Sequence, residues 1–113
     1  MFTHIPGLKF VIPSDAYEAK GLLVQSIRDN VPVIFFEHKA LYDIKGEAPD
    51  EPYAIPFGQA NVTREGTDAT IVAVGRMVMF ANAADKLKTE GISCTVVDPR
   101  TTSQWMSKRI WRL

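Results

Sequence analysis

The stretch SIRDNVPVIFFEHKALY, residues 26–42, decides the fold. Its centre, VIFF at 33–36, is the most apolar and β-prone run in the chain, and Asp29, Asn30 and Pro32 come directly before it. These three residues end a helix and require a strand to begin within a few positions. Four apolar residues without alternation indicate a strand covered on both faces, as in a parallel α/β sheet.

The residues before this stretch predict a complete β-α-β unit. Residues 8–12 have the pattern of a short strand. Asp15 and Glu18 have the spacing of a capping box, and apolar residues recur at helical spacing after them, which predicts a helix over 15–29. With the strand that we place at 32–37, the unit is right-handed.

The residues after this stretch predict a polar connection and a second β-α-β unit. Residues 39–53 are rich in proline, glycine and acidic residues and cannot bury much surface. The elements predicted next are a strand over 55–62, a tight turn at 64–66, a buried strand over 69–74, a helix over 76–90 and a strand over 92–97. The pattern alone fits one small α/β domain.

Two glycines predict details of the helices. Gly21 lies inside the first helix and indicates a close approach of that helix to the sheet. Gly91 has the position of a C-terminal helix stop. We expect the second helix to place five apolar residues on one side: Met77, Phe80, Ala81, Ala84 and Leu87.

Composition narrows the class of protein. The chain has 113 residues, the length of one ordinary domain, with 46% hydrophobic and 23% charged residues and a formal net charge of 0. This balance argues against a non-specific nucleic-acid or anionic-membrane surface. Cys94 is alone, no secretory leader is visible, and no apolar run approaches the ~20 residues of a membrane span. We expect a cytoplasmic protein.

Few residues have the pattern of a catalytic site. Glu37 and His38 directly follow the central strand, where catalytic residues gather in α/β proteins, and Glu37 could be a buried acid with a raised pKa. Polar residues that leave the core into an interface explain the pair more simply. GRMV at 75–78 could bind an anion at a helix start, although a tight strand-to-helix turn is the simpler explanation.

Four segments carry a family resemblance: HIPGLKFVIPSDAYEAKGLLVQSIRDNVPVIFFEHKALY from residue 4, GEAPDEPYAIPFGQANVTREG from 46, TIVAVGRMV from 70 and GISCTVVDPRT from 91. Together they resemble the β subunit of the E1 component of thiamine-diphosphate-dependent 2-oxoacid dehydrogenases. That family includes the pyruvate, branched-chain and acetoin dehydrogenase complexes. The segments SDAYEAKGLL, YAIPFGQA and DPRTTS resemble the acetoin-type members most.

The resemblance implies an α/β fold in two incomplete parts. Residues 1–44 resemble the end of a pyrimidine-binding, transketolase-like parallel-sheet domain, and 45–53 form a linker. Residues 54–103 resemble the start of the transketolase C-terminal-type α/β domain. We prefer this division to a single small domain.

The resemblance also implies a function. The parent enzyme would oxidatively decarboxylate a 2-oxoacid, or cleave acetoin, and pass the acyl group to lipoamide. It would use thiamine diphosphate with magnesium in a heterotetramer of E1 α and β subunits that meets a lipoyl-bearing E2. The family's catalytic and cofactor-contacting residues lie outside these segments, so we assign no catalytic or cofactor-binding residue here and expect the isolated chain to be inactive. The alternatives are a small non-catalytic subunit-interaction module and a truncated gene product.

Two sets of site residues follow. A helix end leaves carbonyl oxygens unpaired, and such oxygens suit hard cations. The resemblance places a structural potassium ion at this bend, with Ser26, Ile27 and Asp29 as the matching ligands; a plain helix C-cap is the alternative. We assign Glu37, His38 and Tyr42 to a subunit interface.

The last ten residues, QWMSKRIWRL at 104–113, depart from the family pattern. Relatives continue after the position of Ser103 with proline, an aliphatic residue and aspartate. The codons of Gln104 to Met106, read one base earlier, can encode Pro-Met-Asp. We therefore predict a frame-shifted tail, with a native amphipathic tail as the alternative.

Overall fold

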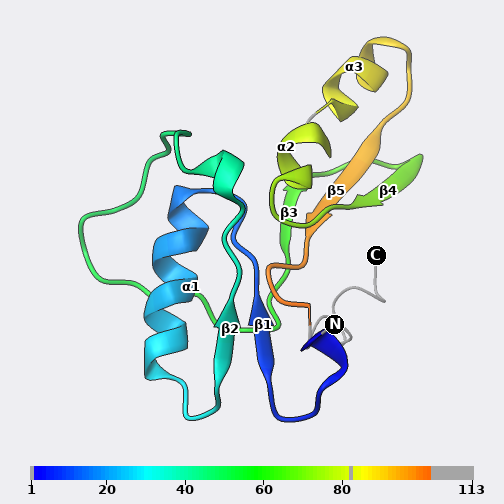
Figure 1. Ribbon diagram of the computed structural model, residues 1–113. Coiled ribbons are helices and arrows are strands. Elements are labelled where there is room, and N and C mark those ends of the chain that lie inside the picture. The colour runs from blue at the N-terminus through cyan, green and yellow to red at the C-terminus, as the bar shows by residue number, and fades with distance from the viewer. Residues whose placement is uncertain (1, 82, 103–113) are drawn as a thin grey trace.

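The computed structural model describes residues 2–81 and 83–102, which form two α/β units joined side by side (Figure 1). The first unit contains η1 (Phe2–His4), β1 (Lys9–Val11), α1 (Ala16–Arg28), β2 (Val33–Phe35) and η2 (Lys39–Leu41). β1 and β2 pair in parallel, with Phe10 opposite Ile34. The predicted first β-α-β unit is therefore confirmed. Within the described residues, no helix is both long and apolar enough to cross a bilayer.

Local sequence signals account for the bounds of α1. Asp15 is the N-cap, and its carboxylate accepts a hydrogen bond of 2.7 Å from the Glu18 amide, as the capping box predicts. Leu22, on the inner face of the helix, is fully buried against Val11 and Ile55. The helix ends at Arg28, before the bend that leads to β2.

The second unit is a mixed three-stranded sheet with two short helices. β3 (Asn61–Arg64), β4 (Ala69–Val72) and β5 (Cys94–Asp98) lie in the order β3-β5-β4, and β5 is buried throughout. β4 pairs with β5 in parallel, as the second predicted β-α-β unit requires, whereas β3 pairs with β5 in antiparallel. α2 (Met77–Ala81) and α3 (Ala84–Thr89) connect β4 to β5.

The predicted helix over 76–90 is wrong in its continuity, and its predicted inner face is confirmed at Ala81, Ala84 and Leu87 but wrong at Met77 and Phe80. It is divided into α2 and α3, and Val78 is buried with Ala81 and Ala84, whereas Met77 and Phe80 are 59% and 55% exposed. The inner face of α2 passes through Val78 and Ala81, which leaves Met77 and Phe80 on its outer side. The C-terminal stop is confirmed: Gly91 has φ 83°, and the amides of residues 91 and 92 donate to the carbonyls of Lys88 and Leu87, which is a Schellman motif.

Three strand predictions also need correction. Only the end of the predicted strand over 55–62 belongs to β3, and β4 is largely exposed rather than buried. The central strand is not covered on both faces, because β2 is half-buried along its length and Phe36 is 48% exposed. Within the described residues β1 is the only strand paired with β2. The resulting two-stranded sheet is too small to bury both faces of β2.

Gly21 marks a close approach, but its partner is not the sheet. A Cβ at Gly21 would lie 2.6 Å from the Ile55 side chain and 2.7 Å from the Tyr53 ring. The Ile55 amide donates to the Gly21 carbonyl, and the Tyr53 ring stacks on Tyr17 with centroids 4.6 Å apart. The segment that follows the polar connection therefore packs against α1 at Gly21 and places Ile55 in the same core cluster as Val11 and Leu22.

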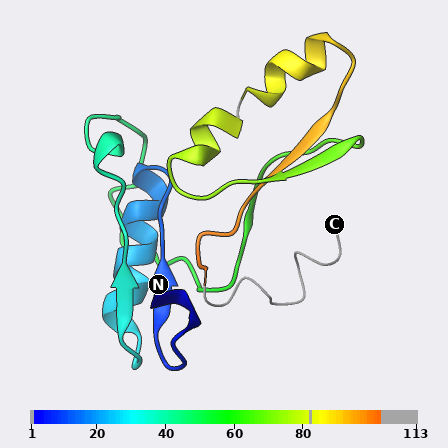
Figure 2. The same cartoon turned by 45° about the vertical axis from the view of Figure 1, so that its right-hand side comes forward.

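The two units meet along the free edge of β1, a contact that we call the seam (Figure 2). Val11 forms an antiparallel bridge with Thr101, which follows β5. The Ile12 amide donates to the Arg100 carbonyl at 2.9 Å, and the Thr102 amide donates to the Phe10 carbonyl at 3.1 Å. The end of the second unit thus extends the sheet of the first.

Candidate functional site

The bend between α1 and β2 carries the three residues that the resemblance assigns to potassium. The Ser26 hydroxyl donates to the Leu22 carbonyl at 2.7 Å within α1, and the Ile27 side chain is 77% exposed. Asp29 is the C-cap residue of α1 in an extended conformation. The three side chains therefore have separate environments, and only their main chain follows one continuous bend.

The Asp29 carboxylate already has two partners. Lys9 Nζ lies 2.8 and 2.6 Å from its two oxygens, and the Val31 amide donates to Oδ1 at 2.9 Å. The hydrogen bond from Lys9 is the main cause that lowers the pKa of Asp29. This pair ties the end of α1 to the start of β1.

A potassium ion at this bend would therefore depend on main-chain carbonyl oxygens at the end of α1, which suit a hard cation. Across residues 2–81 and 83–102, no group of three or more His, Cys, Asp or Glu side chains is arranged to hold a metal ion. The assignment of Ser26, Ile27 and Asp29 stays a prediction.

Replacing Lys9 by methionine is expected to raise the pKa of Asp29 towards its ordinary value, because the largest cause of its lowering is removed. An aspartate whose pKa is lower in the folded state than in the unfolded state stabilises the fold at pH values above its unfolded pKa. This stabilisation is lost as the pH falls through the folded-state pKa. The variant should therefore lose stability mainly above the ordinary pKa of an aspartate. A carboxyl ¹³C NMR titration would measure the shift, with exposed Lys88→Met as control; an unchanged Asp29 midpoint would contradict the expectation.

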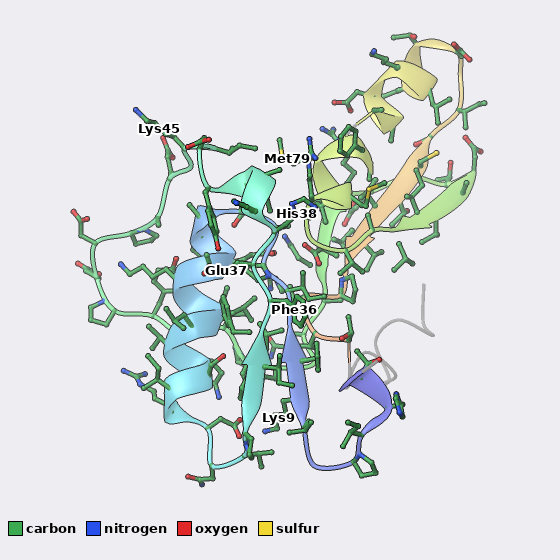
Figure 3. All side chains as sticks on the ribbon, in the orientation of Figure 1. Lys9, Phe36, Glu37, His38, Lys45 and Met79 are labelled. Carbon is green, nitrogen blue, oxygen red and sulfur yellow. The ribbon has the colours of Figure 1, made fainter. Side chains whose placement is uncertain are left out.

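The predicted interface residues gather just beyond the carboxyl end of β2, where Figure 3 labels Glu37 and His38. The Tyr42 hydroxyl donates to Glu37 Oε2 at 3.0 Å, and this hydrogen bond raises the pKa of Tyr42. His38 Nδ1 accepts from the Ala40 amide at 3.2 Å and caps η2. All three side chains are exposed, so the prediction that Glu37 could be a buried acid is wrong.

These residues line one side of an open groove of about 230 Å³. Its other side is formed by Pro13, before α1, and by Ala16 and Ala19 in the first turns of α1. The groove thus has an apolar floor with an acid, a histidine and a phenol along one rim. This arrangement can contact another protein surface through both apolar packing and hydrogen bonds.

The seam contains a polar cluster that sequence reasoning missed. Glu18, only 1% exposed, accepts hydrogen bonds from the Ser14 hydroxyl at 2.8 Å and from the Ser14 amide at 3.1 Å through Oε2. Its Oε1 accepts from Arg100 Nε at 2.7 Å and from Asn61 Nδ2 at 3.5 Å. One carboxylate thereby connects α1, β3 and the segment after β5.

Asp98 is the second acid of this cluster and is fully buried. Its Oδ1 accepts from the Arg100 amide at 2.8 Å, whereas its Oδ2 has no hydrogen-bond partner among the described residues. Burial, followed by the charge of Glu18, raises the pKa of Asp98 to about 7. The capping-box pattern identified Glu18 only as a helix-start residue, and no local pattern connects it to Arg100, 82 positions further on.

Comparisons with known proteins agree with this architecture. Residues 1–45 match the pyrimidine-binding domain of transketolase, and residues 58–112 match the transketolase C-terminal domain. The β subunit of acetoin:2,6-dichlorophenolindophenol oxidoreductase from Cupriavidus necator is 59% identical over 91% of this chain and 31% of that subunit. The pyruvate dehydrogenase E1 component subunit beta of Bacillus subtilis is 54% identical over 87% of this chain and 31% of that subunit.

This chain is similar to E1 β subunits over most of its own length. The predicted resemblance and the predicted transketolase-like α/β fold class are confirmed. The chain spans about a third of the length of these curated relatives.

Solved structures show the same fold. A split-gene transketolase described as an inactive beta4 tetramer superposes with a TM-score of 0.73 at 30% identity, over 86% of this chain and 32% of that chain. A transketolase from Pichia stipitis superposes with a TM-score of 0.66 at 18% identity, over 96% of this chain and 17% of that chain. The predicted tail at 104–113 lies outside the described residues, and its frame-shifted origin stays a prediction.

Proposed function

We propose that this chain is part of the E1 β subunit of a thiamine-diphosphate-dependent complex that oxidises a 2-oxoacid or acetoin. The observation that carries the proposal is the 59% identity to the acetoin subunit over 91% of the chain. Together with the acetoin-type wording of SDAYEAKGLL and DPRTTS, it favours acetoin as the substrate of the parent enzyme. The setting that we propose is the cytoplasm.

The cofactor, with magnesium, supplies the electron sink for cleavage of the bond next to the carbonyl group. No residue of this chain is assigned to contact it. We propose that residues 1–44 form part of the scaffold of the pyrimidine-binding domain and that residues 54–103 form part of the scaffold of the C-terminal-type domain. Residues 45–53 are the linker between them. A potassium ion at residues 26–29 would belong to the same scaffold.

We further propose that the groove beside η2 contacts another subunit, either E1 α or a second β subunit, and that E2 binds the parent complex elsewhere. Glu37, His38 and Tyr42 are exposed and border an apolar floor, and a mixed apolar and polar surface of this kind is typical of subunit contacts. A heterotetramer is the assembly that we expect.

The isolated chain, with thiamine diphosphate and magnesium, is expected to reduce 2,6-dichlorophenolindophenol with acetoin no faster than a mixture without protein. Dye reduction measured by absorbance tests this, and turnover by the purified chain would overturn it. Adding the E1 α subunit of an acetoin-type complex separates the alternatives. Restored turnover supports a functional fragment, stable complex formation without turnover supports an interaction module, and neither supports a truncated product.

A matched pair of variants tests the interface. Tyr42→Ala should weaken binding of the α subunit or of a second copy, because it removes the phenol at the groove rim together with its bond to Glu37. Tyr17→Ala serves as control, because Tyr17 is a partly exposed tyrosine of the same unit that does not line the groove. Equal binding by both variants in a pull-down or by light scattering would place the contact elsewhere.

A further inference from the structure

The polar cluster at the seam has an imbalance of charge. Two carboxyl groups, Glu18 and Asp98, are 1% and 0% exposed, and among the described residues the guanidinium of Arg100 forms an ion pair with Glu18. Two ionised acids and one guanidinium would leave one uncompensated negative charge in the interior, which is costly. One bound proton would make the cluster neutral.

Hydrogen bonding indicates where that proton belongs. The Asp98 side chain lies beside the side chains of Ser14 and Glu18. Ser14 directs its hydroxyl to Glu18 Oε2, and Arg100 directs Nε to Glu18 Oε1. Asp98 Oδ2 is left without a donor among the described residues. Two ionised carboxylates cannot hydrogen-bond to each other, since both only accept, whereas a protonated acid donates to its neighbour.

We propose that Glu18 and Asp98 share a single proton at and below neutral pH, and that this proton holds the two α/β units together at the seam. The proton supplies the missing donor and removes the excess charge in one step. Its loss leaves two adjacent buried carboxylates that repel each other. Because the Arg100 carbonyl also accepts a hydrogen bond from the Ile12 amide, this repulsion acts on the segment that extends the sheet of β1.

The surroundings of the pair agree with this assignment. The charged and polar side chains around it are Arg100, Ser14, Asn61 and Asp15, the last of which is exposed and accepts from the Glu18 amide. The raised pKa of Asp98, about 7, has burial as its first cause and the charge of Glu18 as its second. A carboxyl group whose pKa is higher in the folded state than in the unfolded state contributes its full stabilisation below the unfolded pKa. This stabilisation is lost as the pH rises through the folded-state pKa. The seam should therefore weaken between about pH 4 and pH 7.

Carboxyl ¹³C NMR of the full chain tests the proposal directly. We expect the Asp98 carboxyl group to titrate near neutral pH. Asp98→Asn assigns the signals and should abolish the near-neutral step, because its amide donates permanently. An Asp98 signal that is already ionised from pH 5 upward in the folded wild-type chain would overturn the proposal.

Amide hydrogen exchange measures the effect on the seam. Protection of the Ile12 and Thr102 amides, corrected for intrinsic rates, should fall by roughly tenfold or more from pH 5.5 to pH 8. The Ala73 amide, which bonds to Val97 inside the second unit, is the internal control and should change less. The same seam-specific loss in Asp98→Asn would contradict the proposal. Glu18→Gln provides a second variant if Asp98→Asn does not fold, since it also removes one acid and keeps the shape.

Discussion

Replacing Arg100 by methionine is expected to lower the free energy of unfolding by about 3–5 kcal/mol, the usual cost of removing one partner of a buried ion pair. Arg100 Nε lies 2.7 Å from Glu18 Oε1, and the two side chains are 13% and 1% exposed. Methionine keeps the apolar stem of arginine without its guanidinium, so Glu18 would be left buried without its cation, beside the buried acid Asp98. Since small domains are stable by ~5–15 kcal/mol, this is a large share of the total stability.

Urea unfolding followed by circular dichroism would measure this loss. Arg64→Met is the matched control, because its ion pair with Asp85 is at the surface, where the arginine is 34% and the aspartate 59% exposed. Exposed pairs contribute ~0–1 kcal/mol. The double variant Glu18→Gln with Arg100→Met should recover part of the loss, because it removes one buried charge. Equal losses in the two arginine variants would show that the seam pair is not stabilising.

Replacing Gly66 by alanine is expected to destabilise the chain by about 3 kcal/mol or more, at the upper end of the cost of overpacking. A Cβ at Gly66 would lie 2.3, 2.5 and 2.7 Å from three main-chain atoms of Cys94. Main-chain atoms at the start of β5 cannot move aside as a side chain does. The same glycine exchanges hydrogen bonds with the Thr95 hydroxyl, at 3.0 Å from its amide and 2.7 Å to its carbonyl.

Gly91→Ala is the control that separates steric overlap from backbone strain. Gly91 has φ 83°, and a methyl group added there would meet no atom within 4 Å among the described residues, so its replacement costs only conformational strain, ~1 kcal/mol. Both variants are compared by the same urea unfolding. A smaller loss for Gly66→Ala than for Gly91→Ala would mean that β5 accommodates the methyl group.

Local signals in the sequence determined most of the first unit and the direction of both β-α-β connections. The capping residues Asp15 and Glu18 and the break at residues 29–32 predict α1 within one residue at each end. Gly91 ends α3 as expected, because a glycine just after the last turn can adopt positive φ at no steric cost. Each of these features depends on residues a few positions apart, so the local sequence is sufficient to predict it.

Only the tertiary structure decided the order of the second sheet, the break between α2 and α3, and the seam. β5 lies between β3 and β4 and is buried throughout, and this order depends on pairs that are 25 positions apart for β4 and more than thirty positions apart for β3. Glu18 has the local pattern of a capping residue, and its partnership with Arg100 and Asp98 arises only when the segment after β5 lies along β1. The physical reason is that a buried acid is stabilised by whatever group the fold brings to it, and that group is distant in the sequence.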